Sequence, residues 1–213
     1  GRTLQELGYG SGLWKTQPLV AIKAPVFSMS KLAGVDTYLG PEMKSTGEVI
    51  GLDEEFLPAM TKALLAAGLM LPSNGSILLT IADKDKSEVV PLVKELSGLD
   101  YKIYATEGTA AMVQGLGIPV TTIDKKLNEG HPNVVDVIRD KVVDAVINTV
   151  SGASTAIRDG FEIRRAAVEQ RIPCYPSLDT ARAATASISH GLGAYQVKPT
   201  NEYLQAAPKN LLE

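Results

Sequence analysis

Short apolar runs alternate with helical patterns through most of the second half of the chain. The runs predict strands at 76–82, 101–105, 118–123, 144–148 and 172–175. Apolar residues spaced three to four apart predict helices at 87–96, 134–139, 161–170 and 180–189. A further helix is expected after Glu107-Gly108-Thr109 and ends at Leu116. Strands that alternate with helices pair in parallel, and continuous apolar strands fit a sheet covered on both faces. The pattern therefore predicts an α/β fold, a doubly wound five-stranded parallel sheet, at 74–190.

The chain before this domain has a different texture. Residues 1–52 are rich in Pro and Gly and show no long helical period, so they predict short extended segments that are interrupted at Pro25 and Pro41. From Asp53, a candidate helix cap, apolar residues recur at helical spacing up to a Leu-Pro-Ser-Asn-Gly linker. The predicted units are 1–52, a helix and linker at 53–73, the domain at 74–190, and an irregular tail at 191–213.

Composition narrows the class of protein. The chain has 213 residues, of which 45% are hydrophobic and 21% charged, as in a folded globular protein. A net charge of -3 argues against nucleic-acid binding, which normally needs a basic excess. Cys174 cannot form an internal disulfide, and two histidines give too few ligands for a Cys/His metal site.

No membrane helix or signal peptide is evident, so we expect a cytoplasmic protein. A start without Met suggests a piece of a longer chain.

Polar residues follow the predicted strands, where an open parallel sheet binds its ligands. Lysines, hydroxyls and an amide at helix starts suit a phosphate, because they donate hydrogen bonds or neutralise its charge. The candidates that follow the strands are Lys84 or Lys86, Thr106, Thr109, Lys125 or Lys126, Asn148, Thr149 and Ser151. No catalytic or metal-binding residue is predicted.

Four of these candidates also have a structural interpretation. Thr106 and Thr109 suit helix caps, Lys86 belongs to a run of alternating charges that solvent can accommodate, and Asn148 suits a turn. The chain lacks a GxxxxGK[ST] loop and a GxGxxG motif after the first predicted strand, which argues against triphosphatase and dinucleotide-binding roles.

Several motifs resemble the large subunit of carbamoyl phosphate synthase. The segment GVDTYLGPEMKSTGEVIG (34–51) is similar to the end of its second ATP-grasp unit. Residues 74–190 resemble its methylglyoxal-synthase-like regulatory domain through DKDK (83–86), ATEGTA (105–110), NEGHP (128–132), VINTVSG (146–152) and EIRRAAV (162–168). The resemblance implies that the ATP and Mg (or Mn) sites of the parent enzyme precede residue 1, with no cofactor in this part.

The resemblance also implies an effector. In this family the regulatory domain binds nucleotide monophosphates such as UMP or IMP, and the phosphate positions match Lys86, Thr106, Thr109, Lys126, Asn148 and Thr149. Val150, Ala153 and Ser154 replace a threonine and two arginines of some members, which leaves the effector open. Ala24 and Pro176 stand where ornithine-responsive members carry a carboxylate and a hydroxyl, so we expect no response to ornithine.

Three functions follow from these observations. The resemblance implies an allosteric domain of a glutamine-dependent, ATP-consuming synthase of pyrimidine or arginine biosynthesis, not itself catalytic. Its implied partners are the rest of the large subunit, the glutaminase small subunit and further copies of itself, with no nucleic acid and no membrane. One alternative is a methylglyoxal-synthase-like lyase, for which Glu129 alone is a poor substitute for the carboxylates needed. The other is a structural or oligomerisation module with a vestigial pocket.

Overall fold

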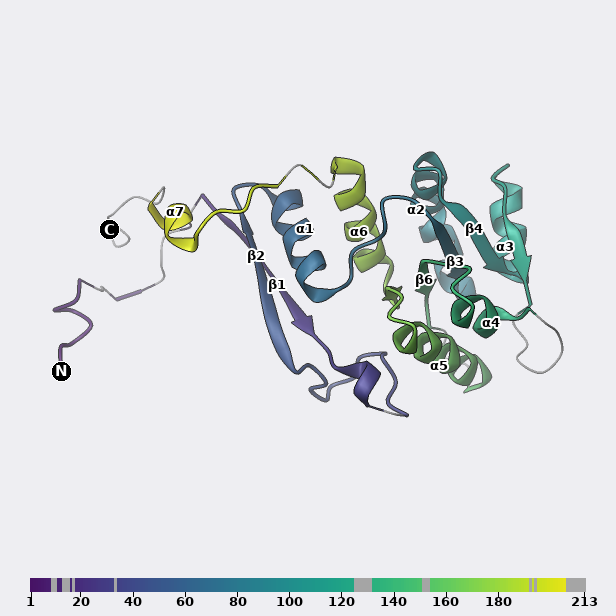
Figure 1. The fold of residues 1–213 in the computed structure, drawn as a ribbon, viewed down its shortest axis with the longest axis horizontal. Helices are drawn as coiled ribbons and strands as arrows, with labels where there is room; N and C mark the ends of the chain where they lie inside the picture. The colour runs from purple at the N-terminus through teal and green to yellow at the C-terminus, as the bar shows by residue number, and fades with distance from the viewer. Residues whose placement is uncertain are drawn as a thin grey trace.

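The structure of the chain, a computed structural model, has two parts that lie side by side (Figure 1). It describes residues 1–8, 11–12, 16, 18–32, 34–124, 132–150, 154–191, 193 and 195–205. One part is a hairpin with a covering helix, and the other is a parallel sheet between helices. The predicted division of the chain into four units stays a prediction.

The sheet has five strands, all parallel, as the apolar runs predict. Their order is β5-β4-β3-β6-β7, so the first strand of the domain lies in the middle and the chain order reverses there. The strands are β3 (Ser76–Thr80), β4 (Lys102–Thr106), β5 (Thr121–Ile123), β6 (Ala145–Asn148) and β7 (Cys174–Tyr175). The carboxyl end of β3, between β4 and β6, is therefore the switch point at which such sheets bind ligands.

Helices cover both faces of the sheet. Ile77 and Leu79 of β3 pack into one apolar cluster, whereas Leu78 between them packs into another on the opposite face. The first cluster receives α2 (Lys86–Gly98), α3 (Glu107–Gly115) and α6 (Leu178–His190), and the second receives α4 (Val134–Arg139) and α5 (Ser154–Glu169). A short 3₁₀ turn, η2 (Asp83–Asp85), leads into α2. The doubly wound fold is confirmed.

Two predicted strands begin later than expected by more than one residue, because the turns that end the preceding helices include the first apolar residues of each run. Ile118 donates its backbone N–H to the Val113 carbonyl, and Ile172 donates to the Ala167 carbonyl. Both bonds close a helix end, with positive φ at Gly117 in the first turn and at Arg171 in the second. The strands then start at Thr121 and Cys174.

The N-terminal region contains a two-stranded hairpin, with Pro41 in the stretch that separates the strands. β1 (Val20–Val26) pairs antiparallel with β2 (Gly47–Asp53), and a 3₁₀ turn, η1 (Met29–Lys31), lies between them. The expected break at Pro25 is wrong, because Pro25 lies inside β1 opposite Glu48. Among the described residues β1 has a partner on one side only, and an edge strand tolerates the missing N–H.

Helix α1 (Phe56–Ala67) packs closely on this hairpin. A β-carbon placed on Gly51 of β2 would lie 2.0 Å from the carbonyl oxygen of Ala59, so the two backbones touch there. The helix cap differs from the prediction: Glu55 occupies the N-cap position, while Asp53 ends β2 and pairs with Lys62 at 2.7 Å.

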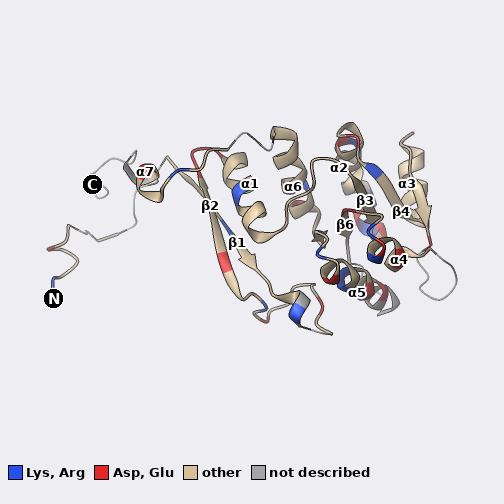
Figure 2. Cartoon of the chain, viewed as in Figure 1, with Lys and Arg blue, Asp and Glu red and all other residues tan. Residues whose placement is uncertain are grey.

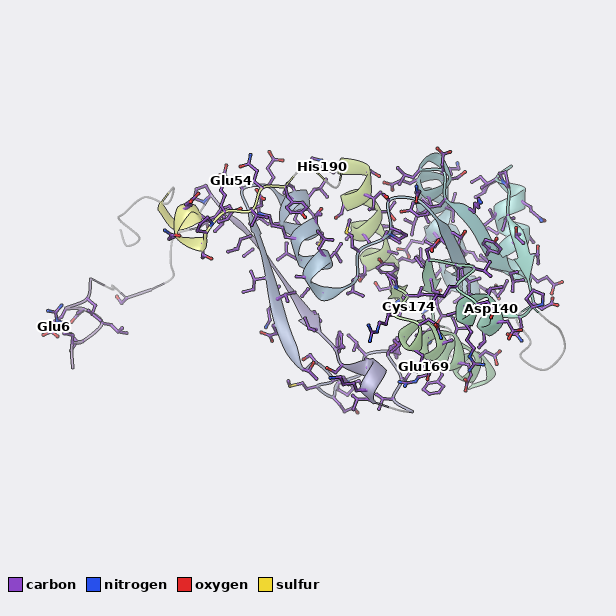
Figure 3. All side chains as sticks on the ribbon, in the orientation of Figure 1. Glu6, Glu54, Asp140, Glu169, Cys174 and His190 are labelled. Atoms are coloured by element: carbon purple, nitrogen blue, oxygen red, sulfur yellow. The ribbon has the colours of Figure 1, made fainter. Side chains whose placement is uncertain are left out.

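The C-terminal tail is partly helical, which corrects the expectation of an irregular tail. Helix α7 (Thr200–Gln205) brings Tyr203 against α1, where the Lys62 Nζ donates to the Tyr203 hydroxyl at 2.7 Å. Lys198 lies 3.5 Å from Glu54, which Figure 3 places near α7 at the end of β2. Among the described residues, no helix is long and apolar enough to cross a bilayer.

Candidate functional site

The backbone that leaves β3 is held from both sides at the carboxyl edge of the sheet. Ile81 donates its N–H to the Thr109 hydroxyl oxygen at 3.1 Å, and Ala82 donates to that of Thr149 at 2.8 Å. Thr149 in turn donates its own N–H to the Thr80 carbonyl at 3.1 Å. The edge expected from the parallel strands is therefore a hydrogen-bonded unit built from three strand ends.

Lys86 reaches across this edge to the start of α3. Its Nζ lies 2.7 Å from an Asp83 carboxylate oxygen, and a β-carbon placed on Gly108 would lie 3.2 Å from the same Nζ. The Lys86 side chain is 28% exposed, while that of Asp83 is 93% exposed. An ammonium group accessible to solvent thus lies beside the first turn of a helix.

Thr106 stands at the N-cap of α3, yet its side chain does not cap the helix. It makes no hydrogen bond to the first-turn N–H groups, and its hydroxyl donates to the Thr109 hydroxyl at 3.4 Å. The first turn therefore keeps its positive dipole end without a capping oxygen from Thr106. The capping interpretation of Thr106 is wrong.

Two of the other predicted residues are buried within the edge. Thr109 is 1% exposed and Asn148 is 4% exposed, and their side chains hydrogen-bond to other residues of the edge. The structure brings Lys86, Thr106, Thr109, Asn148 and Thr149 to one end of the sheet. Lys126 and Ser151 lie outside the described residues, as do Glu129 and His131. Whether the predicted residues bind phosphate stays a prediction.

Sequence reasoning missed a buried arginine next to this edge. Arg164 of α5 is 1% exposed, and its Nη1 donates to the Asn148 Oδ1 at 2.8 Å. A β-carbon on Gly160, one turn earlier, would lie 2.7 Å from the Arg164 Nη1, so that glycine leaves room for the guanidinium. The signal was available, since Arg164 follows the buried Ile163 and precedes buried Ala166 and Ala167 within the EIRRAAV motif.

Arg164 also binds the N-terminal part of the chain. Its Nε and Nη2 donate to the two carboxylate oxygens of Asp36 at 2.8 and 2.5 Å, a bidentate pair. The Tyr38 ring lies 5.9 Å from the guanidinium carbon, within cation–π range. Arg165 adds bonds to the carbonyls of Met29 and Leu32 at 3.0 and 2.7 Å. These contacts dock residues 29–32 and 34–38, here called the docking segment, on α5.

The surroundings of Asp36 favour its charged form. Partial burial opposes ionisation, but the bond from Arg164, the Tyr38 N–H and the charges of Arg164 and Lys44 outweigh it and lower the pKa of Asp36. At Cys174 burial has the larger effect: it outweighs the opposing charge of Arg164 and raises the pKa of the thiol to about 12. Cys174, beside α5 in Figure 3, is a weakly nucleophilic, partly buried side chain that packs against the second apolar cluster.

Neither a broad charged surface nor a cluster of metal ligands marks the site in the described part of the chain. Figure 2 shows acidic and basic residues intermixed over the helices of the described chain, and Lys86 places a positive charge beside the start of α3. Within the ranges that the structure describes, no group of three His, Cys, Asp or Glu residues could hold a metal ion. His190 ends α6 (Figure 3).

The chain matches known proteins over nearly all of its length. A profile for the MGS-like domain matches residues 88–176. A carbamoyl phosphate synthase large chain of Thermomicrobium roseum is 50% identical over 203 residues, 95% of this chain and 19% of the relative. One of Thermoanaerobacter sp. (strain X514) is 43% identical over 216 residues, 100% of this chain and 20% of the relative.

A crystal structure of methylglyoxal synthase from Elizabethkingia anophelis NUHP1 aligns with a TM-score of 0.43 and 19% identity, covering 63% of this chain and 93% of that chain. The chain spans about a fifth of the length of the curated relatives that it matches. The resemblance of its motifs is confirmed: the chain is a relative of carbamoyl phosphate synthase large chains and carries an MGS-like domain.

Proposed function

We propose that this domain binds the phosphate group of a nucleotide monophosphate, UMP or IMP in type, at the carboxyl edge of its sheet. Binding there regulates the carbamoyl phosphate synthase of which the chain forms part. The proposal rests on the relatives, which are large chains of that enzyme, and on the residues that the edge brings together.

The position of Lys86 carries the proposal. Its ammonium lies at the first turn of α3, where the Thr106 side chain leaves the helix N–H groups uncapped. Backbone N–H groups, the helix dipole and a lysine together form an arrangement that favours a phosphate. Because Asp83 is almost fully exposed, an incoming anion displaces a weak surface pair rather than a buried one.

For the parent enzyme we propose an ATP-dependent, glutamine-hydrolysing ligase of pyrimidine or arginine biosynthesis that needs Mg or Mn outside this part. The glutaminase small subunit, the rest of the large subunit and further copies of the chain are its proposed partners. An effector changes its activity only if the two enzyme states bind that effector with different affinity. The domain itself performs no catalytic step in this proposal.

The test is calorimetric titration of the chain with inorganic phosphate, UMP and IMP. We expect Lys86→Met to weaken phosphate binding about 10- to 100-fold, the loss of one charge-assisted hydrogen bond. Lys84→Met is the matched control, because Lys84 lies two residues earlier, in the 3₁₀ turn that leads into α2, and is exposed. The chain is expected to keep its fold in both variants, since neither side chain is part of the apolar core.

The outcomes separate the candidate functions. An equal effect of both lysine variants would show that Lys86 holds no phosphate and that only general surface charge matters. No binding of any of the three ligands would contradict the proposal and favour a structural module. Release of methylglyoxal from a three-carbon phosphate substrate would favour the lyase.

A further inference from the structure

One guanidinium joins the edge of the sheet to the N-terminal part of the chain. Arg164 contacts Asn148, the last residue of β6, and Asp36, which lies 128 positions earlier in the sequence. Among the described residues, Arg165 bonds to backbone carbonyls of the same docking segment and to Glu169 on its own helix. Of these two neighbouring arginines, Arg164 is the one whose bonds in the described chain reach the edge.

Arg164 fixes the orientation of the Asn148 amide. A guanidinium can only donate, so the amide oxygen of Asn148 must face it and the amide NH₂ must face the other way. The NH₂ donates to the Thr80 hydroxyl at the end of β3. The guanidinium of Arg164 is therefore connected through the Asn148 amide to Thr80, at the end of the strand that leads to Lys86.

Asp36 neutralises that charge in the docked state. Both of its carboxylate oxygens accept bonds from Arg164, and the guanidinium is almost completely removed from water. A buried charge interacts strongly with any second charge nearby, because little water screens it. The carboxylate of Asp36 and an anion at the edge accordingly compete for the same positive charge.

We propose that Arg164 couples the docking segment to the phosphate site, so that a bound anion weakens the hold of Arg164 on Asp36. The inference rests on the proposed function, since it concerns the same site. By thermodynamic linkage the effect is reciprocal: releasing Asp36 strengthens anion binding by the factor by which the anion weakens docking. Effector binding thereby loosens a contact between the domain and the hairpin region.

The test compares two variants that each remove one carboxylate paired with an arginine of α5. Asp36→Asn is expected to tighten the binding of inorganic phosphate about fivefold or more, the usual lower range of coupling between two sites. Glu169→Gln is the matched control, because its partner Arg165 bonds to the docking segment and, among the described residues, not to the edge. The phosphate affinity of this variant is expected to stay within about 1.5-fold of that of the unchanged chain.

Two results would overturn the coupling in different ways. Equal phosphate affinity in Asp36→Asn and the unchanged chain would remove the coupling while leaving the phosphate site in place. No phosphate binding in the unchanged chain would overturn the proposed function and, with it, the coupling.

A second measurement needs no variant. Tyr38 donates its backbone N–H to the Asp36 carboxylate at 3.0 Å, so hydrogen exchange at Tyr38 reports on the docked segment. Saturating inorganic phosphate is expected to speed that exchange in the unchanged chain, while exchange within the α1–hairpin contact stays constant. Unchanged or slower exchange at Tyr38 would contradict the coupling.

Discussion

Replacing Arg164 by methionine is expected to lower the free energy of unfolding by about 3–5 kcal/mol, the usual cost of breaking a buried charge pair. The substitution leaves the Asn148 amide oxygen without its donor in a buried place and releases the docking segment from α5. Urea unfolding followed by circular dichroism measures the effect. Arg182→Met is the control, because Arg182 makes its ion pairs with Glu88 and Asp179 on the surface. Its expected loss is at most about 1 kcal/mol.

The stabilisation by Arg164 should also depend on pH in one direction. The folded chain holds the pKa of Asp36 below its ordinary value, so the pair contributes fully above the unfolded pKa near 4. The contribution is lost as the pH falls through the lowered folded pKa. The difference between the unchanged chain and Arg164→Met should therefore shrink in acid. A pH-independent difference, or a loss no larger than that of Arg182→Met, would contradict the role given to this pair.

A methyl group on Gly51 is expected to destabilise the chain by about 1–3 kcal/mol, the range for overpacking. The new carbon would meet backbone atoms of α1, including the Ala59 oxygen at 2.0 Å and the Ala63 nitrogen at 2.7 Å, so no side chain can move aside. Gly47→Ala tests the same substitution at the start of the same strand, where nothing lies within 4 Å. We expect its effect to stay within about 0.5 kcal/mol. Equal losses in thermal unfolding would show that β2 and α1 do not touch as described.

The parallel sheet was predictable because its signal is local and repeated. Each apolar run is short and continuous, and each intervening helix shows its own period, as at Val134–Arg139, where the predicted and observed bounds agree. The ends of elements were less predictable. Ile118 and Ile172 are as apolar as strand residues, but the turns that close α3 and α5 use them first. The helix around Tyr203 depends on contacts with α1, which is distant in the sequence.

The candidate site was only partly accessible to sequence reasoning. Because parallel strands end at one edge of the sheet, the sequence alone predicts that Lys86 and the threonines lie near one another. The same rule does not show which side-chain oxygens accept hydrogen bonds within the protein. The hydroxyl oxygens of Thr109 and Thr149 do so, from the backbone N–H groups of Ile81 and Ala82. The Arg164–Asp36 pair was not predicted, because no periodic pattern connects residues 128 positions apart.

The central claim is that a phosphate binds between Lys86 and the first turn of α3. It is tested most directly by recording ¹H–¹⁵N spectra of the chain during titration with inorganic phosphate and UMP. We expect saturable shifts for the amides of Glu107, Gly108 and Thr109, and constant positions for amides of β1 and α1. Shifts spread evenly over the surface, or gathered away from the start of α3, would contradict the claim.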